Sequence, residues 1–293
     1  MIKASQFSTY LTKRGFHPQT IYGYTNKLKQ YFVWCDQNHL DSDRTTLDEL
    51  YDYKRYCLEQ GLKNGSIRER LSVIKHYFQS IHRKDNPALL VKHKKRVMTL
   101  PDKVLTEEDL KELYRNIEVK TFIQRRDKAM LGLVIFQALK RDELELLEIH
   151  HLDLDEATIY VPSSTKTNSR TLDLHPTQMN HLMTYLYDFR PKLLAESAKE
   201  TNRLFFSMGS SNSLNNALQI KVNAMKKQFP NFKSLMQVKE SRMTLWIKQH
   251  GIRKAQYFSG IKYASSMLRY KTTSIEKLKK KLSIAHPMER LKL

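Results

Sequence analysis

Residues 127–147 read DKAMLGLVIFQALKRDELELL, and this stretch decides the fold. Its first thirteen residues are apolar on nearly every side of a helix, which is typical of a helix at the centre of a domain. A polar segment, KRDE, follows at residues 140–143, so charged side chains are expected where this helix ends. The stretch predicts a mainly α-helical domain built around residues 127–139.

Upstream of this helix the chain carries four segments with apolar residues at helical spacing. They cover residues 4–14, 18–38, 45–60 and 65–83, and Pro18 stands near the start of the second. The fourth has an apolar stripe on one face and Arg68, Arg70 and Lys75 on the other. This basic face either contacts the phosphates of a nucleic acid or is simply solvated. We expect a four-helix N-terminal domain over residues 1–84.

Residues 85–103, DNPALLVKHKKRVMTLPDK, combine prolines with a basic run and little periodicity, which is typical of a linker. Lys94, Lys95 and Arg96 in this run either lie against a DNA backbone or face solvent. A second domain is expected over residues 104–293. Near its start, Thr106 and Asp109 in LTEEDLKELY predict a helix N-cap followed by an acidic first turn.

A β-hairpin is expected after the central helix. TIYV and TLDL alternate in polarity and flank a polar turn that contains Lys166. From Pro176 onward the sequence again has mostly helical spacing, with a break near Gly251 and a turn at Gly260. The last of these helices begins in GIKYASSMLRY, residues 260–270, and carries Tyr270.

The charge of the chain points to a polyanionic partner. Lys and Arg number 51 against 30 Asp and Glu, which gives a formal net charge of +21, and the excess is spread over both halves of the chain. Double-stranded DNA is the simplest such partner. The alternative is a generally basic protein of unrelated function. No P-loop is present, which argues against a nucleotide-driven motor.

Other classes of protein are disfavoured by composition. Cys35 and Cys57 are the only cysteines, and the histidines show no HExxH-like spacing, so we expect no metal site and no cofactor. No run of residues is long and apolar enough for a membrane span, and the first residues lack the apolar core of a signal peptide. We therefore expect a cytoplasmic, nucleoid-associated protein without a membrane partner.

The order of these segments resembles the tyrosine recombinase, or phage integrase, family over nearly the whole chain. FQALKRDELELL is similar to the family segment in which glycine, leucine and arginine precede glutamate and leucine. TKTNSRTLDL resembles the hairpin with a lysine near its turn, and residues 246–270 resemble the end of the catalytic domain in integrases of mobile elements. The resemblance implies an N-terminal SAM-like core-binding domain and an α-rich catalytic domain with a small β-hairpin.

The resemblance also implies a reaction without metal or ATP. A tyrosine attacks a DNA phosphodiester, forms a 3′-phosphotyrosyl bond and releases a 5′-hydroxyl, so the bond energy is conserved in the intermediate. Cations must stabilise the non-bridging oxygens, and an acid must protonate the departing oxygen. Strand exchange between paired protomers implies a tetrameric synapse on DNA, or a mixed assembly with another recombinase.

Matching position by position assigns the site. Tyr270 falls on the nucleophile, Lys166 on or near the general acid, and Lys140 on the first catalytic arginine, with Arg141 beside it. The second catalytic arginine falls on Lys239, or on Arg242 if the match is shifted by three residues. The position of the histidine after Gly260 holds Ile261, which Lys262 follows. Arg141 and Lys262 are further candidates for contacts with DNA.

These departures leave two readings open. Lysine is a mobile point charge and cannot replace the planar fork of arginine at a bidentate site, and isoleucine cannot donate a hydrogen bond. Each missing transition-state donor is expected to lower the rate by about 10²–10³-fold. The chain is therefore expected to be either a tyrosine recombinase with a weakened pocket or a non-catalytic relative that binds DNA.

Overall fold

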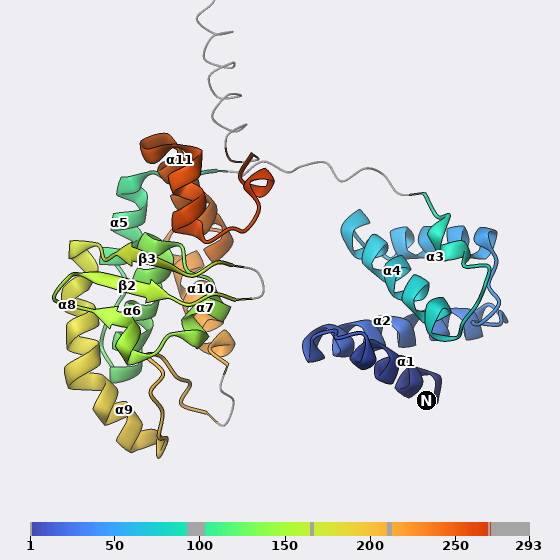
Figure 1. Cartoon of the computed structure of the whole chain (residues 1–293), viewed down its shortest axis with the longest axis horizontal. Coiled ribbons are helices and arrows are strands. Elements are labelled where there is room, and N and C mark those ends of the chain that lie inside the picture. The colour runs from blue at the N-terminus through green and yellow to red at the C-terminus, as the bar shows by residue number, and fades with distance from the viewer. Residues whose placement is uncertain (1, 93–102, 165–166, 210–212, 269, 271–293) are drawn as a thin grey trace, which may run out of the picture. The chain divides into compact units, whose positions relative to one another are not determined.

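The computed structural model describes residues 2–92, 103–164, 167–209, 213–268 and 270 (Figure 1). Contacts divide the chain into two compact units, Met1–Val97 and Met98–Leu293. The division falls inside the segment expected to be a linker. Helices dominate both units, and one small sheet lies in the second, so the predicted mainly α class is confirmed.

The first unit is the predicted four-helix module. Its helices are α1 (Ile2–Lys13), α2 (Pro18–Gln37), α3 (Leu47–Glu59) and α4 (Asn64–Ser80), followed by the short turn η1 (Pro87–Leu89). Pro18 occupies the first turn of α2, where its missing N–H costs no helical bond. Thr46 and Glu49 close a reciprocal capping box on α3.

Aromatic side chains fill the core of this unit. Tyr31, Tyr53, Tyr77 and Phe78 are all buried. The hydroxyl of Tyr31 lies 2.8 Å from that of Thr45, so a phenol in the core keeps a hydrogen-bond partner. This core supports α4, whose Arg68, Arg70 and Lys75 remain partly exposed.

The second unit is built around the predicted central helix, α6 (Phe122–Gln137), in which every residue from Arg126 to Gln137 is buried. Its other helices are α5 (Glu107–Arg115), α7 (Arg141–Leu146), α8 (Pro176–Thr184), α9 (Arg190–Ser197), α10 (Asn215–Gln228) and α11 (Leu235–Ser259). Short 3₁₀ helices are η2 (Ile149–His151) and η4 (Ala264–Met267), and η3 (Tyr185–Phe189) is a π-helical segment. Thr106 caps α5 together with Asp109, as predicted. α6 packs against α5, α8 and α11.

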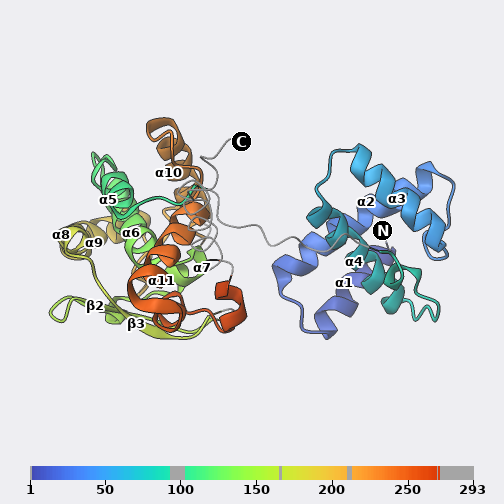
Figure 2. The same cartoon turned by 90° about the horizontal axis from the view of Figure 1, so that it is seen from above.

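The sheet has three antiparallel strands, β1 (Leu152–Asp153), β2 (Thr158–Val161) and β3 (Arg170–Asp173). Ile159 pairs with Leu172, which confirms the expected hairpin and turns both side chains to the core. β1 has only two residues, so an alternating sequence pattern could not predict it. Figures 1 and 2 show the sheet along one side of the unit, with α6 behind it.

Several cations of the second unit are structural. Lys128 donates to the carbonyls of Arg115 and Ile117, and Arg190 donates to those of Thr201 and Arg203. Burial lowers the pKa of both side chains. Part of the net positive charge therefore satisfies backbone carbonyls inside the protein instead of facing a partner.

Ala198, which ends α9, adopts a left-handed conformation with φ of 49°. Glycine adopts this conformation without the steric cost that alanine incurs, so Ala198→Gly should stabilise the unit by about 0.5–1 kcal/mol. Ala195, exposed within the same helix, offers a matched control, because Ala195→Gly should destabilise it by a similar amount. Urea unfolding of both variants measures the difference, and a destabilised Ala198→Gly variant would contradict this prediction.

Candidate active site

The junction between α6 and α7 carries the first candidate. Ala138 ends α6 in the left-handed region with φ of 52°, and Lys140 is the N-cap residue of α7. The backbone N–H of Lys140 donates to Glu143 Oε2 at 2.8 Å. This bond fixes the backbone from which the partly exposed Lys140 side chain starts.

Glu143 and Arg170 form an ion pair that is completely buried. Arg170 Nη1 lies 2.8 Å from Glu143 Oε1, and neither side chain is exposed to solvent. Burial alone would raise the pKa of the Glu143 carboxyl, but the hydrogen bond and charge of Arg170 outweigh it and hold this pKa below its ordinary value. Glu143 is therefore a carboxylate that links α7 to β3.

Arg170 also reaches the end of α11. Its Nε donates to the carbonyl of Phe258 at 2.8 Å, in the last turn of the helix, where carbonyls lack helical partners. Gly260 follows in the left-handed region with φ of 64°, and a Cβ there would lie 2.5 Å from Arg170 Nη1. Glycine is required at this position both by its φ and by the guanidinium beside it.

The hairpin turn is joined to the same segment. The N–H of Asn168 donates to the carbonyl of Gly260 at 2.9 Å, and Thr167 pairs with Ile261 in an isolated antiparallel bridge. Lys166, the predicted general acid, directly precedes this bridge but lies outside the described residues. The structure thus brings the base of the lysine-bearing turn to the stretch that leads to Tyr270.

Lys239 on α11 belongs to the same electrostatic group as Lys140. The pKa of its ammonium falls to about 8, first because burial removes water and next because Lys140 repels its charge. Glu143 opposes this fall, and Arg170 adds a smaller repulsion. The two lysines therefore act on one another across the α6–α7 junction and α11.

Arg242, the alternative for the second arginine position, has structural contacts. Its Nε donates to the carbonyl of Ile135 at 3.0 Å, and its Nη1 forms a 2.6 Å ion pair with Glu107. The guanidinium also lies 5.7 Å from the ring centre of Phe136. These contacts join α11 to α5 and α6.

Tyr270 is buried, with 3% of its surface exposed. It belongs to a small apolar cluster that also contains Ala138, Trp246 and Met267, so it packs in the group that includes the end of α6. Trp246 is buried in the same cluster, with 8% of its surface exposed. Tyr263, seven residues before Tyr270, is 72% exposed.

The remaining candidates lie on surfaces. Arg141 is exposed and donates to Asn215 Oδ1 at 2.7 Å, whereas Arg70 donates to the Tyr53 hydroxyl at 3.2 Å. Lys262 is exposed next to Ile261. Lys94, Lys95 and Arg96 lie outside the described residues.

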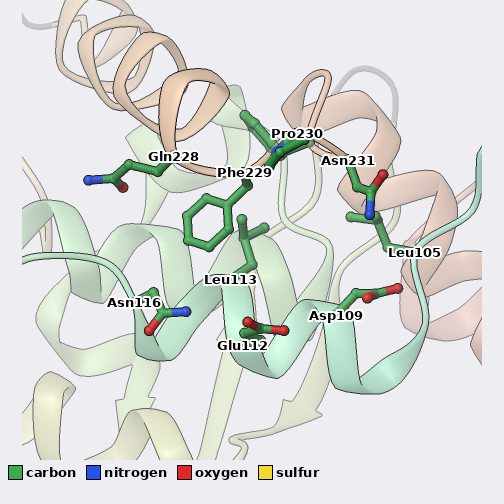
Figure 3. A pocket seen from close by; sticks show the side chains of 10 residues that line it. Leu105, Asp109, Glu112, Leu113, Asn116, Gln228, Phe229, Pro230 and Asn231 are labelled. Atoms are coloured by element: carbon green, nitrogen blue, oxygen red, sulfur yellow. The ribbon is translucent and has the colours of Figure 1, made fainter.

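A cavity of about 320 Å³ opens between α5 and the residues that connect α10 to α11 (Figure 3). Asp109 and Glu112 line it beside Leu113, Phe229 and Pro230. Its lining shares no residue with the group around Lys140 and contains no cation, so it does not suit a phosphate.

Among the described residues, no group of three or more His, Cys, Asp or Glu side chains could hold a metal ion. Within the same residues, no helix has the length and apolar character that crossing a membrane requires.

Sequence reasoning missed Arg170 and gave Glu143 no role of its own. The signal for Glu143 was its place in the segment FQALKRDELELL. For Arg170 the only signal was a basic residue at the start of a strand pattern, because its three partners lie on α7, in the hairpin turn and on α11.

Gly260→Ala should destabilise the second unit more than Gly251→Ala. Both glycines have positive φ, 64° and 79°, but a Cβ at Gly251 meets nothing within 4 Å, whereas one at Gly260 collides with Arg170. Backbone strain costs about 1–3 kcal/mol at either position, and the collision adds to it only at Gly260. Thermal unfolding of the two variants measures the difference. Equal losses of thermal stability in the two variants would show that backbone strain alone sets the cost.

Comparison with known proteins finds an integrase-type N-terminal segment and recombinase relatives. Residues 4–85 match a family model described as phage integrase, N-terminal SAM-like domain. A relative named tyrosine recombinase XerD from Vibrio vulnificus is 28% identical over 192 residues, which cover 64% of this chain and 62% of the relative. The match thus spans less than two thirds of the length of that curated relative.

Solved structures share the fold. A Tn1549 transposon integrase in complex with a circular intermediate DNA gives a TM-score of 0.67 at 14% identity, over 92% of this chain and 94% of that one. A lambda integrase tetramer bound to a Holliday junction gives a TM-score of 0.64 at 16% identity, over 90% of this chain and 76% of that one. In its N-terminal segment, its curated relatives and its fold, the chain is similar to the tyrosine recombinase, or phage integrase, family.

Proposed function

We propose that this chain is a site-specific DNA strand transferase in which Tyr270 attacks a DNA phosphodiester and forms a 3′-phosphotyrosyl intermediate. One observation carries the proposal. Arg170 bonds to the segments that lead to Lys140, to the hairpin turn and to Tyr270, which are far apart in the sequence. This reaction needs a tyrosine nucleophile, cations and an acid in one place, and these are the groups that the three segments carry.

In this proposal Lys140 and Lys239 stabilise the non-bridging oxygens of the attacked phosphate. Both carry positive charge at positions where the family has arginine, and their mutual repulsion favours an anion between them. We propose Lys239 for the second position, because Arg242 is committed to Glu107 and to the carbonyl of Ile135. Lys166 is proposed to protonate the departing 5′ oxygen.

The proposed partner is duplex DNA inside the cell, in the nucleoid. The related integrases of known structure are bound to a circular intermediate DNA or to a Holliday junction, in the latter case as a tetramer. We propose that copies of this chain assemble in the same way on DNA, or join a mixed assembly with another recombinase. Arg68, Arg70, Lys75, Lys94, Lys95, Arg96, Arg141 and Lys262 are proposed to contact the DNA.

A second candidate function is supported by specific residues. In the match to the family, Lys140 falls at the first arginine position, Lys239 at one of two alternatives for the second, and Ile261 at a histidine position. A chain with this pocket could hold DNA without cutting it. Trapping the covalent intermediate on nicked duplexes separates the two functions, because binding is common to both and cutting is not.

Binding to duplex DNA should weaken steeply as salt rises. A protein that contacts six to ten phosphates releases their counterions, so affinity should fall by about 10³–10⁵-fold between 50 and 200 mM salt. Fluorescence anisotropy with a labelled duplex of about 30 base pairs measures this slope. An affinity that does not change with salt would contradict both DNA-based functions and favour a basic protein of unrelated function.

A further inference from the structure

Arg170 bonds directly to three segments of the candidate active site. Its Nη1 contacts Glu143 at 2.8 Å and the carbonyl of Asn168 at 3.4 Å, and its Nε contacts the carbonyl of Phe258 at 2.8 Å. Glu143 in turn accepts the N–H of Lys140. Asn168 follows the turn of Lys166, and Phe258 precedes Gly260. Lys140 and Lys166 are therefore within three residues of an Arg170 contact, and Tyr270 follows twelve residues after Phe258.

The surroundings of Arg170 leave no room for contact with DNA. Its side chain has no exposed surface, and the guanidinium lies against the backbone of Gly260, where a Cβ would come within 2.5 Å. A group so enclosed can act on a substrate only through the residues that it holds. Its planar fork suits this task, because it directs several donors in fixed directions and cannot lose its charge.

We propose that Arg170 is a positioning residue that holds the Lys140 backbone, the base of the hairpin turn at Asn168 and the chain leading to Tyr270 in the one arrangement that allows DNA cleavage. This inference rests on the proposed function and assigns Arg170 no contact with the substrate. Removing its fork should free the hairpin turn from the Gly260 segment, while the core of the unit, built around α6, stays folded. Cleavage should then fail even with DNA bound.

The test compares Arg170→Met with Arg126→Met. Arg126 is a second buried arginine of this unit, paired with Asp127 at 2.7 Å and bonded to the carbonyl of Phe206, but it contacts none of the candidate segments. Arg170→Met leaves Glu143 without its ion-pair partner, and Arg126→Met leaves Asp127 with only Lys221 at 3.6 Å, so both should lower Tm, Arg170→Met by roughly 10 °C and Arg126→Met by less. At a temperature where both variants are folded, any difference in cleavage or in amide exchange reflects where the lost arginine lies and not a loss of stability.

Two readouts are measured on the folded variants. The first is the rate of covalent complex formation on nicked duplexes as a function of DNA concentration. Arg170→Met should lower the rate at saturating DNA by about 10²-fold, with the half-saturating concentration changed less than threefold, whereas Arg126→Met should match the wild type. The second is amide exchange at Asn168, whose N–H is bonded to Gly260, and it should accelerate at least tenfold only in Arg170→Met.

A rescue variant separates charge from position. Arg170→Lys restores a cation for Glu143 but cannot donate to Glu143 and Phe258 together in the geometry of the fork. It should recover most of the lost Tm while recovering little of the cleavage rate. Full recovery of cleavage by Arg170→Lys would overturn the inference, since charge alone would then suffice.

The outcomes distinguish this inference from the proposed function. If Arg170→Met and Arg126→Met cleave equally and exchange equally at Asn168, Arg170 is merely structural. If the wild type binds the duplexes but forms no covalent complex, the proposed function fails, and the exchange of Asn168 alone then decides. Faster exchange only in Arg170→Met would still support the positioning of these segments, and equal exchange would overturn it.

Discussion

Tyr270→Phe should abolish the covalent protein–DNA complex, whereas Tyr263→Phe should leave it unchanged. The reaction needs the phenolic oxygen, and no other atom is lost in this substitution. The ring of Tyr270 packs in the cluster that contains Trp246 and Met267, and phenylalanine preserves that packing. DNA binding should therefore persist, and stability should change by about 1 kcal/mol or less.

Tyr263 provides the matched control because it lies in the same segment and is the more exposed of the two tyrosines. Exposure alone would favour Tyr263 as a nucleophile, whereas alignment with the family favours Tyr270. Each variant lacks only one hydroxyl group. Comparing Tyr270→Phe with Tyr263→Phe therefore shows whether exposure or the match to the family identifies the nucleophile.

The measurement is a denaturing gel. Duplexes are taken from the DNA on both sides of the gene and nicked near candidate sites, so that cleavage releases a short fragment and cannot reverse. Metal is left out. A shifted band with wild type and Tyr263→Phe, but not with Tyr270→Phe, is the expected result. A band that survives in Tyr270→Phe would assign the nucleophile elsewhere, and no band with intact binding would favour the non-catalytic relative.

The helices of this chain could be predicted because their signals are local. Apolar spacing marks α2 and α4, Thr106 and Asp109 mark the start of α5, and the fully apolar stretch marks α6. Each signal lies within one or two turns of the chain. The hairpin could be predicted for the same reason, since its alternation and its turn are contiguous in the sequence.

The candidate site could be predicted only in part, because its decisive contacts are long-range. Lys239 and Arg242 lie three residues apart on one helix, so spacing could not separate them. What distinguishes them is Glu107, which is 135 residues away from its partner Arg242. The role of Arg170 likewise depends on Phe258, which is 88 residues away. A single sequence does not contain these pairings.

The net charge of the chain likewise predicts only part of the candidate site. The total of +21 correctly directs attention to a polyanion, but it does not reveal which cations are available. Lys128, Arg190 and Arg242 all donate to backbone carbonyls inside the second unit. Only the fold separates these structural cations from Lys140 and from the exposed Arg141.

Lys239→Met should lower the rate of DNA cleavage by about 10²–10³-fold. The substitution removes one of the two charges that we propose act on the phosphate oxygens, and removal of a single transition-state donor has an effect of that size. Lys248→Met is the matched control on the same helix, because Lys248 is exposed and should tolerate the change. Single-turnover rates on nicked duplexes at saturating DNA measure the loss, and equal rates for the two variants would exclude a catalytic Lys239.

The low pKa of Lys239 adds a pH dependence with a definite sign. With a pKa of about 8, the ammonium is charged in about nine tenths of the molecules at pH 7 and in about one tenth at pH 9. Since the charged form is the proposed ligand, kcat/KM should fall nearly tenfold over this range. Lys239→Arg cannot lose its charge there, so its profile should stay flat through pH 9.

Stability should change in the opposite direction, which separates loss of charge from unfolding. In the unfolded chain Lys239 returns to its ordinary pKa near 10.5, so between about pH 8 and 10.5 the unfolded state binds more protons than the folded state. Its burial therefore weakens the fold below pH 8, and this penalty fades as pH rises. The difference in Tm between the wild type and Lys239→Met should shift in favour of the wild type from pH 7 to pH 9, while cleavage by the wild type falls. If this difference in Tm and the cleavage rate of the wild type both fell from pH 7 to pH 9, unfolding would explain the loss of cleavage, and Lys239 would have no part in it.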